Sequence, residues 1–281
     1  MSHHRPLAIY YEHPTWFQPL FDELERRRVA HLRIDAGEHA FNPTQRPRYA
    51  AVLNQAGATT SKRERANTIF YTHSYLTHLE EQGVPLINGI RAWRYETSRA
   101  LQVELLQRLG LNAPKTRVVN HPSQLPAAAE GLLFPVIVSS NVGGLDGKRF
   151  DSFLSLVVGV YEGLIEPSVD GTLVVQEYHW AEEGSVIRSS ALGGRFTHAT
   201  RVTTNAKSRA VTPSSETIAL VERVVRAAKI DIGSVETFVS LRDGETYVSR
   251  IGTLAVPAFS GEAAVSALVD FLQERVAEKA A

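Results

Sequence analysis

The chain has 281 residues, 43% hydrophobic and 21% charged, so it can bury a sizeable core in two domains or one large composite. Its 30 lysines and arginines balance 30 aspartates and glutamates, which argues against a sequence-independent nucleic-acid binder, because such a protein needs a basic surface. The absence of cysteine excludes a disulfide scaffold, a cysteine-ligated zinc site, an iron–sulfur cluster and a cysteine nucleophile.

No segment approaches the roughly 18 uninterrupted apolar residues of a membrane span. The N-terminus runs directly into an apolar strand pattern and lacks the long apolar core of a signal peptide. We therefore expect a cytoplasmic protein that binds neither nucleic acid nor a membrane.

The first third of the chain alternates between strand and helix patterns. Short apolar runs predict strands, and apolar residues three to four positions apart predict helices. The expected strands are 7–11, 31–34, 50–54 and 85–90, and the expected helices are 16–27 and 66–81. This rhythm predicts a parallel sheet with crossover helices. The first turn, 12–15, contains no glycine, so we do not expect a dinucleotide to bind there.

The remaining two thirds mix helices with hairpins. The middle third predicts, in order, helix 96–109, strand 116–120, helix 122–130, strand 135–138, a glycine loop at 141–148, helix 151–165 and strand 172–178. The last third predicts a hairpin of 185–191 and 196–202, helix 217–229, strands 235–241 and 246–251, and helix 265–276. The polar stretch 203–215 is the best candidate for a mobile loop.

Four stretches in order, 83–120, 134–150, 173–202 and 235–255, resemble the ATP-grasp superfamily. The resemblance is to the carboxylate–amine ligases related to glutathione synthetase and D-alanine–D-alanine ligase, and it covers about residues 85–260. It implies an α/β (α+β grasp) fold with a small parallel α/β domain at 1–90. A central subdomain with the glycine loop would follow at 91–180, and a C-terminal subdomain at 181–281.

The resemblance also implies a chemistry and its cofactors, ATP and magnesium. In such ligases ATP phosphorylates a carboxylate, and an amine then attacks the acyl phosphate. Lysines neutralise the phosphates, acidic residues and an asparagine hold magnesium, and glycine backbone covers the triphosphate. The substrate would be a small carboxylate and an amine.

The residues at the implied cofactor positions only partly match this pattern. Arg99 stands at the first lysine position and Ser139 at the second, which removes a charge there. The remaining cofactor-binding candidates are the loop residues Gly143, Gly144, Gly147 and Lys148 and the hinge residues Gln176, Glu177 and Tyr178. Arg188 and Arg201 occupy the positions of two arginines that contact phosphates and substrate, and they are the catalytic candidates.

The implied metal site departs most from the pattern. Glu236 matches the first acidic ligand, but Arg250 and Gly252 stand where a second acid and an asparagine are needed. Neither arginine nor glycine offers a side-chain oxygen to magnesium. Arg250 could instead form a salt bridge to Glu236, and Lys148 with Arg149 could bind an anion.

Three functional hypotheses follow. The preferred one is a non-ligating paralogue with a degraded ATP and magnesium site, which binds a protein partner, such as an active paralogue, or a small anionic ligand. The second is an active carboxylate–amine ligase in which arginine and lysine replace the metal and the missing lysine. The third is an enzyme that reuses the cleft for chemistry without ATP. A homodimer is compatible with each.

Overall fold

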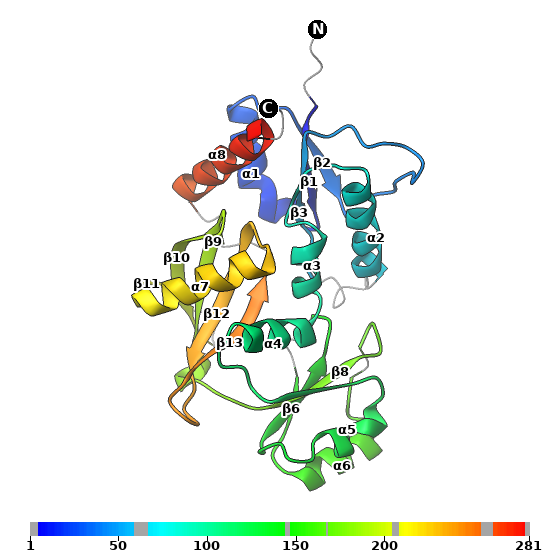
Figure 1. Cartoon of the computed structure of the whole chain (residues 1–281), viewed down its shortest axis with the longest axis vertical. Coiled ribbons are helices and arrows are strands. Elements are labelled where there is room, and N and C mark those ends of the chain that lie inside the picture. The colour runs from blue at the N-terminus through cyan, green and yellow to red at the C-terminus, as the bar shows by residue number, and fades with distance from the viewer. Residues whose placement is uncertain are drawn as a thin grey trace.

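The computed structural model describes residues 5–58, 67–143, 147–166, 168–203, 208–253 and 261–278. These residues form one four-stranded parallel sheet, one four-stranded antiparallel sheet and one five-stranded antiparallel sheet, stacked along the long axis of the molecule with helices beside them (Figure 1). The mixed α/β class predicted from the sequence is therefore confirmed.

The first sheet has the strand order β2-β1-β3-β4, and every pair in it is parallel, as predicted. Its elements are β1 (Leu7–Tyr11), α1 (Pro14–Arg26), β2 (His31–Asp35), β3 (Ala51–Gln55), α2 (Asn67–Glu81) and β4 (Leu86–Ile87). All residues of β1 and β3 are buried, because helices and loops cover both faces of a parallel sheet.

The expected strand 85–90 is wrong beyond Ile87. Asn88 adopts a left-handed conformation with φ of 57°, and its side chain bonds across to the five-stranded sheet. Its Nδ2 donates to the carbonyl of Ile232 at 2.6 Å, and its Oδ1 accepts from the backbone N–H of Asp231 at 2.9 Å. This buried amide ends the strand and joins two of the three sheets.

The expected helix 96–109 is confirmed as α4 (Arg99–Arg108), which begins three residues later than predicted, and the helix before it, α3 (Ile90–Glu96), was not predicted. The break falls at Thr97 and Ser98, where the Ser98 hydroxyl accepts a hydrogen bond from the backbone N–H of Leu101 at 3.3 Å. Serine is a strong N-cap residue, so it begins a new helix rather than continuing the old one. Glu96 consequently ends a helix and is buried.

The middle sheet is antiparallel, with the order β5-β8-β6-β7. Its elements are β5 (Thr116–Val119), the 3₁₀ turn η2 (Pro122–Gln124), α5 (Leu125–Ala128), β6 (Val136–Ser140), β7 (Lys148–Phe150), α6 (Phe153–Tyr161) and β8 (Leu173–Glu177). Ser152 caps α6, and the helix ends four residues before the predicted 165. Lys148 belongs to a strand, so the predicted loop 141–148 is wrong at its last residue.

The third sheet has the order β11-β10-β9-β12-β13 and is antiparallel throughout. Its elements are the 3₁₀ turn η3 (Glu182–Gly184), β9 (Val186–Leu192), β10 (Arg195–Val202), β11 (Ser208–Val211), α7 (Ser215–Ala228), β12 (Ile232–Val239) and β13 (Thr246–Gly252). The predicted hairpin is confirmed. The predicted mobile loop 203–215 is wrong at 208–211, which pair with β10, and its residues 204–207 lie outside the described residues.

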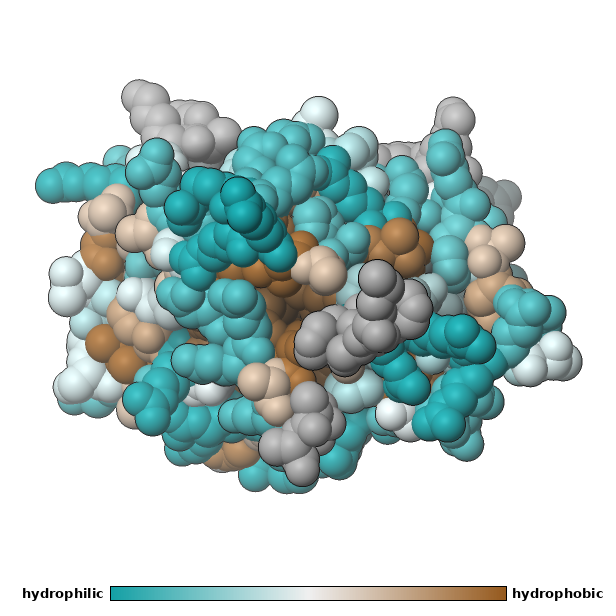
Figure 2. Space-filling model, turned by 90° about the horizontal axis from the view of Figure 1, so that it is seen from above, coloured by the Kyte–Doolittle hydropathy of each residue, from teal (hydrophilic) through white to brown (hydrophobic). Residues whose placement is uncertain are grey.

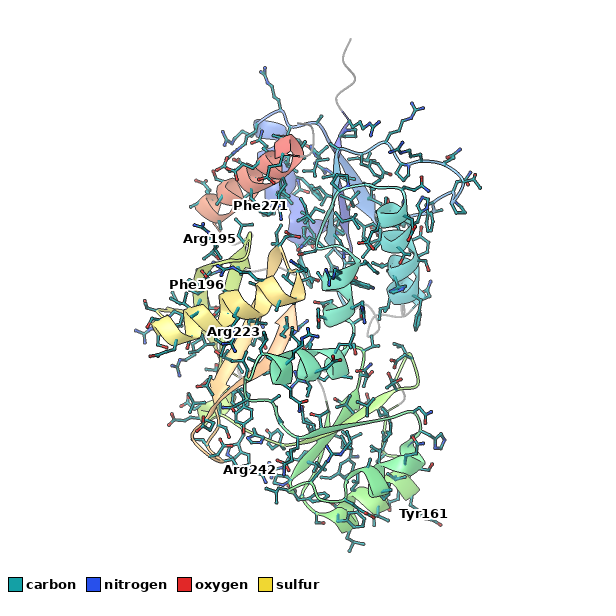
Figure 3. All side chains as sticks on the ribbon, in the orientation of Figure 1. Tyr161, Arg195, Phe196, Arg223, Arg242 and Phe271 are labelled. Carbon is teal, nitrogen blue, oxygen red and sulfur yellow. The ribbon has the colours of Figure 1, made fainter. Side chains whose placement is uncertain are left out.

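The last helix, α8 (Glu262–Glu278), returns to the first sheet. Leu268, Val269 and Leu272 share a buried cluster with Phe17 and Leu20 of α1. Phe271 of the same helix packs against this cluster and also lies beside the β9–β10 turn, where a Cβ on Gly193 would lie 3.2 Å from its ring (Figure 3). The predicted division at residues 90 and 180 stays a prediction, but α8 links the end of the chain to its beginning.

The surface seen from the N-terminal end is mostly hydrophilic, and hydrophobic side chains show mainly in a hollow between hydrophilic ones (Figure 2). Within the described ranges, no helix combines the length and the apolar character needed to cross a bilayer.

Candidate active-site cleft

Segments from all parts of the chain meet at a small cavity of about 40 Å³ between the helices α3 and α4 and the strand β13. The described residues that line it are Ala58, Glu96, Arg99, Gln102, Asn141, Gly143, Ser249 and Arg250. Three candidates named from the sequence, Arg99, Gly143 and Arg250, are thereby brought together. We call this region the cleft.

Arg99 is fixed at the first turn of α4 by one acceptor on the same helix and two acceptors on other strands. Its Nη1 donates to the carbonyl of Ser249 at 2.8 Å and to Gln102 Oε1 at 3.3 Å, and its Nη2 reaches Gln176 Oε1 at 3.4 Å. Burial lowers the pKa of Arg99 to about 10, so it is still charged at neutral pH. Gln176 in turn donates to Thr116 Oγ1 at 2.8 Å, so the hinge and Arg99 form one network.

Asn141 joins the glycine loop to the start of α4. Its Oδ1 accepts from the backbone N–H of Ala100 at 3.0 Å and from the Ser98 hydroxyl at 3.3 Å, and its carbonyl accepts from the N–H of Arg99 at 3.0 Å. The first N–H groups of a helix have no partner within the helix, and an anion could otherwise use them. In this protein Asn141 occupies two of them.

The glycines of the loop have different reasons to be glycine. Gly143 lines the cleft with φ of 65°, a conformation that side chains disfavour. Gly147 lies against β6, where a Cβ would come within 2.4 Å of Ile137 Cγ1 and 2.9 Å of the carbonyl of Val138. Close packing against β6 therefore requires Gly147 whether or not a phosphate binds. Gly144 lies outside the described residues.

The charged end of the loop does not line the cleft. Lys148 and Arg149 are exposed on β7, and Arg149 pairs with Asp151 at 2.7 Å. The Arg149 guanidinium also lies 5.1 Å from the ring centre of Tyr178. Ser139 stands on β6 opposite Val174, two residues before Asn141.

The hinge residues at the end of β8 bond to other parts of the protein through side chains and backbone. Glu177 Oε1 accepts from the backbone N–H of Leu133 at 2.9 Å and lies 3.9 Å from Lys115 Nζ. The N–H of Tyr178 donates to the carbonyl of Pro135 at 2.9 Å, and its carbonyl accepts from Arg242 Nη1 at 3.3 Å. Both backbone groups of Tyr178 thus have partners within the protein.

Glu236 lies between two arginines on the five-stranded sheet. Arg188 on β9 and Arg250 on β13 are its direct cross-strand partners, so the three side chains share one face. Arg188 Nε donates to Glu236 Oε1 at 2.7 Å. The expected salt bridge from Arg250 to Glu236 is wrong, because Arg188 holds this carboxylate and Arg250 lies 3.8 Å from Glu96.

Glu96 was missed by the sequence analysis. Its carboxylate is 1% exposed and accepts from the backbone N–H of Thr253 at 2.7 Å, the Thr253 hydroxyl at 3.2 Å and the N–H of Ala58 at 3.1 Å. A Cβ on Gly252 would lie 3.4 Å from Glu96 Oε2. The signal was an acid directly before the capping pair Thr97 and Ser98, which the continuous helix pattern concealed.

The two catalytic candidates lie on different faces of the five-stranded sheet. Arg188 is paired in register with Thr200, whereas Arg201 is paired with Ile187. Because successive side chains of a strand point to opposite faces, Arg188 and Arg201 lie on opposite faces of this sheet. Arg201 is exposed and stands directly opposite Arg209 of β11.

Among the comparisons with known proteins, the comparison with solved structures finds similar chains. No family model matches the chain, and no curated protein matches it. A RimK domain ATP-grasp protein from Sphaerobacter thermophilus DSM 20745 is similar in structure, with a TM-score of 0.71 and 15% identity over 95% of this chain and 99% of that one. The chain has the ATP-grasp fold.

Two ligases show the same likeness. D-cycloserine synthetase DcsG has a TM-score of 0.71 and 16% identity, over 96% of this chain and 99% of that one. D-alanine–D-alanine ligase from Bacillus anthracis, in complex with ATP, has a TM-score of 0.70 and 14% identity, over 98% of this chain and 97% of that one. At such identities the likeness establishes the ATP-grasp fold and not the activity.

The positions that the resemblance gives to the magnesium ligands hold Glu236, Arg250 and Gly252. Magnesium takes oxygen ligands in octahedral geometry, usually carboxylates, phosphates and waters. Nowhere in the described part of the chain do three or more histidine, aspartate or glutamate side chains gather as a metal would need. Glu236 is held by Arg188, and Arg250 brings a positive charge to the same row.

Proposed function

We propose that this protein is a non-ligating member of the ATP-grasp fold, whose cleft binds a small anionic ligand or supports binding to a protein partner such as an active paralogue. The observation that carries the proposal is the ion pair between Arg188 and Glu236, at 2.7 Å, where a ligase would need a metal ligand. Arg250 stands directly opposite Glu236 on the next strand, and this second positive charge also supports the proposal.

The chemistry of phosphoryl transfer gives the physical reason. The transfer depends on divalent cations and lysines that neutralise charge on the phosphates as it develops. Here Ser139 brings no charge, and the acid that would recruit a cation is neutralised by arginine. Fixed guanidinium groups at Arg99 and Arg250 can attract an anion, but they cannot gather the water and phosphate ligands that magnesium collects.

Calorimetry with the full chain tests the proposal. We expect ATP to bind no more tightly with magnesium than with EDTA, and we expect no ADP release with a panel of carboxylates and amines. Magnesium-dependent ATP binding at micromolar affinity, together with substrate-dependent ADP release, would contradict a non-ligating protein.

A gain-of-function variant tests the assignment of positions. Ser139→Lys, Arg250→Asp and Gly252→Asn together restore the expected lysine, acid and asparagine, and a Cβ at Gly252 meets no atom closer than 3.4 Å. We expect ATP affinity to rise at least ten-fold in magnesium and less in EDTA. The control is Ser139→Lys alone, which should strengthen ATP binding equally in both. No gain in the triple variant would mean that these positions are not the cofactor positions.

An active ligase with a rewired site is the second candidate. Its support is the near-complete coverage of two ligase structures and the contact of Arg99 with the hinge residue Gln176. ADP release that requires both a carboxylate and an amine, and that fails in Arg99→Ala, would favour it over the first candidate.

The location and assembly of the protein belong to the same proposal. We propose that it works in the cytoplasm and forms a homodimer. Light scattering after size exclusion measures the mass against the 31.0 kDa of one chain. A mass near 31 kDa at micromolar concentration would rule out the homodimer and leave the cleft proposal untouched.

A further inference from the structure

A second hollow, of about 720 Å³, lies in the N-terminal part of the fold and shares no lining residue with the cleft. We call it the N-terminal hollow. It is lined by Arg5, by residues 39–42 and 45–49, and by Tyr75 and His78 of α2. Its volume falls within the range of about 300–1,000 Å³ in which proteins bind small molecules.

The hollow exists because one crossover of the parallel sheet has no helix. Residues 36–50 connect β2 to β3 without helix or strand and run beside α2 (Figure 1). An extended chain covers less of a sheet than a helix does. Aromatic rings from both sides meet below it: Phe41 lies 5.2 Å from Tyr75 and 4.9 Å from His78, and His39 lies 4.4 Å from Tyr75.

The rim of the hollow is positive. Arg5, Arg46 and Arg48 line it and are exposed, and none of them forms an ion pair with another described residue. No acidic side chain is among the described residues that line it. In a chain with equal numbers of acidic and basic residues, three arginines around one aromatic floor are a local excess of positive charge.

The floor holds a buried polar atom without a hydrogen bond. His78 Nε2 has no hydrogen-bond partner within the described structure, and beside it Tyr75 is 1% exposed. Burial raises the pKa of the Tyr75 hydroxyl, and the neighbouring Tyr49 raises it further. Unpaired buried polar atoms are uncommon in proteins and cost stability.

We propose that the N-terminal hollow binds a small planar organic anion. Its ring would stack on Phe41 and Tyr49, since aromatic rings favour offset or edge contacts with one another. Its carboxylate or phosphate would be held by Arg46 and Arg48, whose guanidinium groups match the paired oxygens of both anions. This site is independent of the proposed function of the cleft, because the two share no residue.

The test uses the full chain and four probes in calorimetry: phenyl phosphate, benzoate, inorganic phosphate and phenol. We expect phenyl phosphate or benzoate to bind at least ten-fold more tightly than both inorganic phosphate and phenol. The stronger of the two identifies the anionic group. Equal binding of inorganic phosphate and phenyl phosphate would overturn the aromatic part of the proposal.

Arginine variants test where on the protein the anion binds. The double variant Arg46→Gln, Arg48→Gln should weaken the preferred probe at least ten-fold, whereas Arg195→Gln, Arg209→Gln, a matched pair of exposed arginines on β10 and β11, should leave it unchanged. Arg250→Gln should also leave it unchanged. Binding that survives the Arg46 and Arg48 double variant, or is lost with Arg250, would overturn the site. If the double variant does not fold, Arg48→Gln alone and the same probes decide the matter.

Discussion

The cleft and the N-terminal hollow both gather arginines, but only the cleft pairs them with acceptors from the protein. In the cleft, Arg99 donates to the carbonyl of Ser249 and Arg250 lies beside Glu96, and on the strands next to Arg250 the row continues with Arg188, which donates to Glu236. In the hollow, Arg46 and Arg48 have no such partner among the described residues. Arginine content alone therefore says little about which site is open to a ligand.

The difference follows from burial. Removing a charge from water costs far more than a hydrogen bond returns, so a buried charge needs a partner in the fold. A ligand entering the cleft must compete with those partners, whereas a ligand entering the hollow displaces only solvent around exposed arginines. Four predictions test this contrast, from the largest expected effect to the smallest.

Removing the central carboxylate of the cleft should destabilise the protein most. Glu96→Ala leaves the N–H of Thr253 without its acceptor and Arg250 without its ion pair. Urea unfolding should show a loss of about 3 kcal/mol, the scale for breaking a buried charged network. Glu80→Ala, at an exposed position of α2, is the control and should change stability by less than about 0.5 kcal/mol. A similar small loss for both would mean that Glu96 does not hold the cleft together.

The Arg188–Glu236 pair should give the next largest effect. It is partly exposed, with Arg188 at 32% and Glu236 at 10% side-chain exposure, so Arg188→Ala should cost about 1–2 kcal/mol. Arg201→Ala, on the opposite face of the same sheet, is the control and should cost less than about 0.5 kcal/mol. A double-mutant cycle with Glu236→Ala measures the pair directly, and a coupling near zero would contradict the ion pair.

The arginines of the hollow should contribute little to stability. Arg46→Ala and Arg48→Ala should each shift the free energy of unfolding by less than about 0.5 kcal/mol, because removing a solvated surface charge costs little folding stability. A loss above about 1 kcal/mol from either one would show that these arginines are structural after all. The contrast with the cleft would then disappear.

The smallest effect concerns pH. Burial lowers the pKa of His39, which lies at the floor of the hollow and bonds to the Tyr71 hydroxyl at 3.0 Å. The unfolded chain therefore takes up this proton at a higher pH than the folded chain does. Stability is full above the ordinary histidine pKa of about 6.5 and falls as the pH drops below it.

Melting temperatures between pH 7.5 and 5.5 measure how much the buried His39 imidazole changes the pH dependence of stability. His39→Gln should make the decline at low pH shallower, and His73→Gln, at an exposed position of α2, should leave its slope as it is. Identical slopes in the wild type and in His39→Gln would show that the buried imidazole does not contribute.

Much of the fold could be predicted from local pattern. The parallel first sheet, the β9–β10 hairpin and the helices α7 and α8 follow apolar spacing and turn glycines, and the structure has them where expected. The errors occur where a local signal competed with a longer one. Ser98 caps α4 and moves its start from the predicted residue 96 to Arg99. The short β11 was hidden in a polar stretch because its partner β10 gives it its hydrogen bonds.

The candidate site was predictable only in part. The order of the stretches was enough to bring Arg99, Gly143 and Arg250 to one cleft, and they do meet there. Register decided the rest: it puts Arg188 and Arg201 on opposite faces, and it gives Glu236 two arginine neighbours at once. Which arginine pairs with Glu236 depends on side-chain distances that no spacing in the sequence encodes.

The sequence by itself determined most strands and helices and the kinds of charge available, since periodicity, caps and glycines act over a few residues, and its resemblance to ATP-grasp proteins implied their arrangement. Only the tertiary structure decided which charges are neutralised and which stay open to a ligand. Pairing depends on distances of a few ångströms between residues far apart in the chain, and on how far each is removed from water. For this reason the cleft proves to hold its own arginines, and the N-terminal hollow leaves its arginines to solvent.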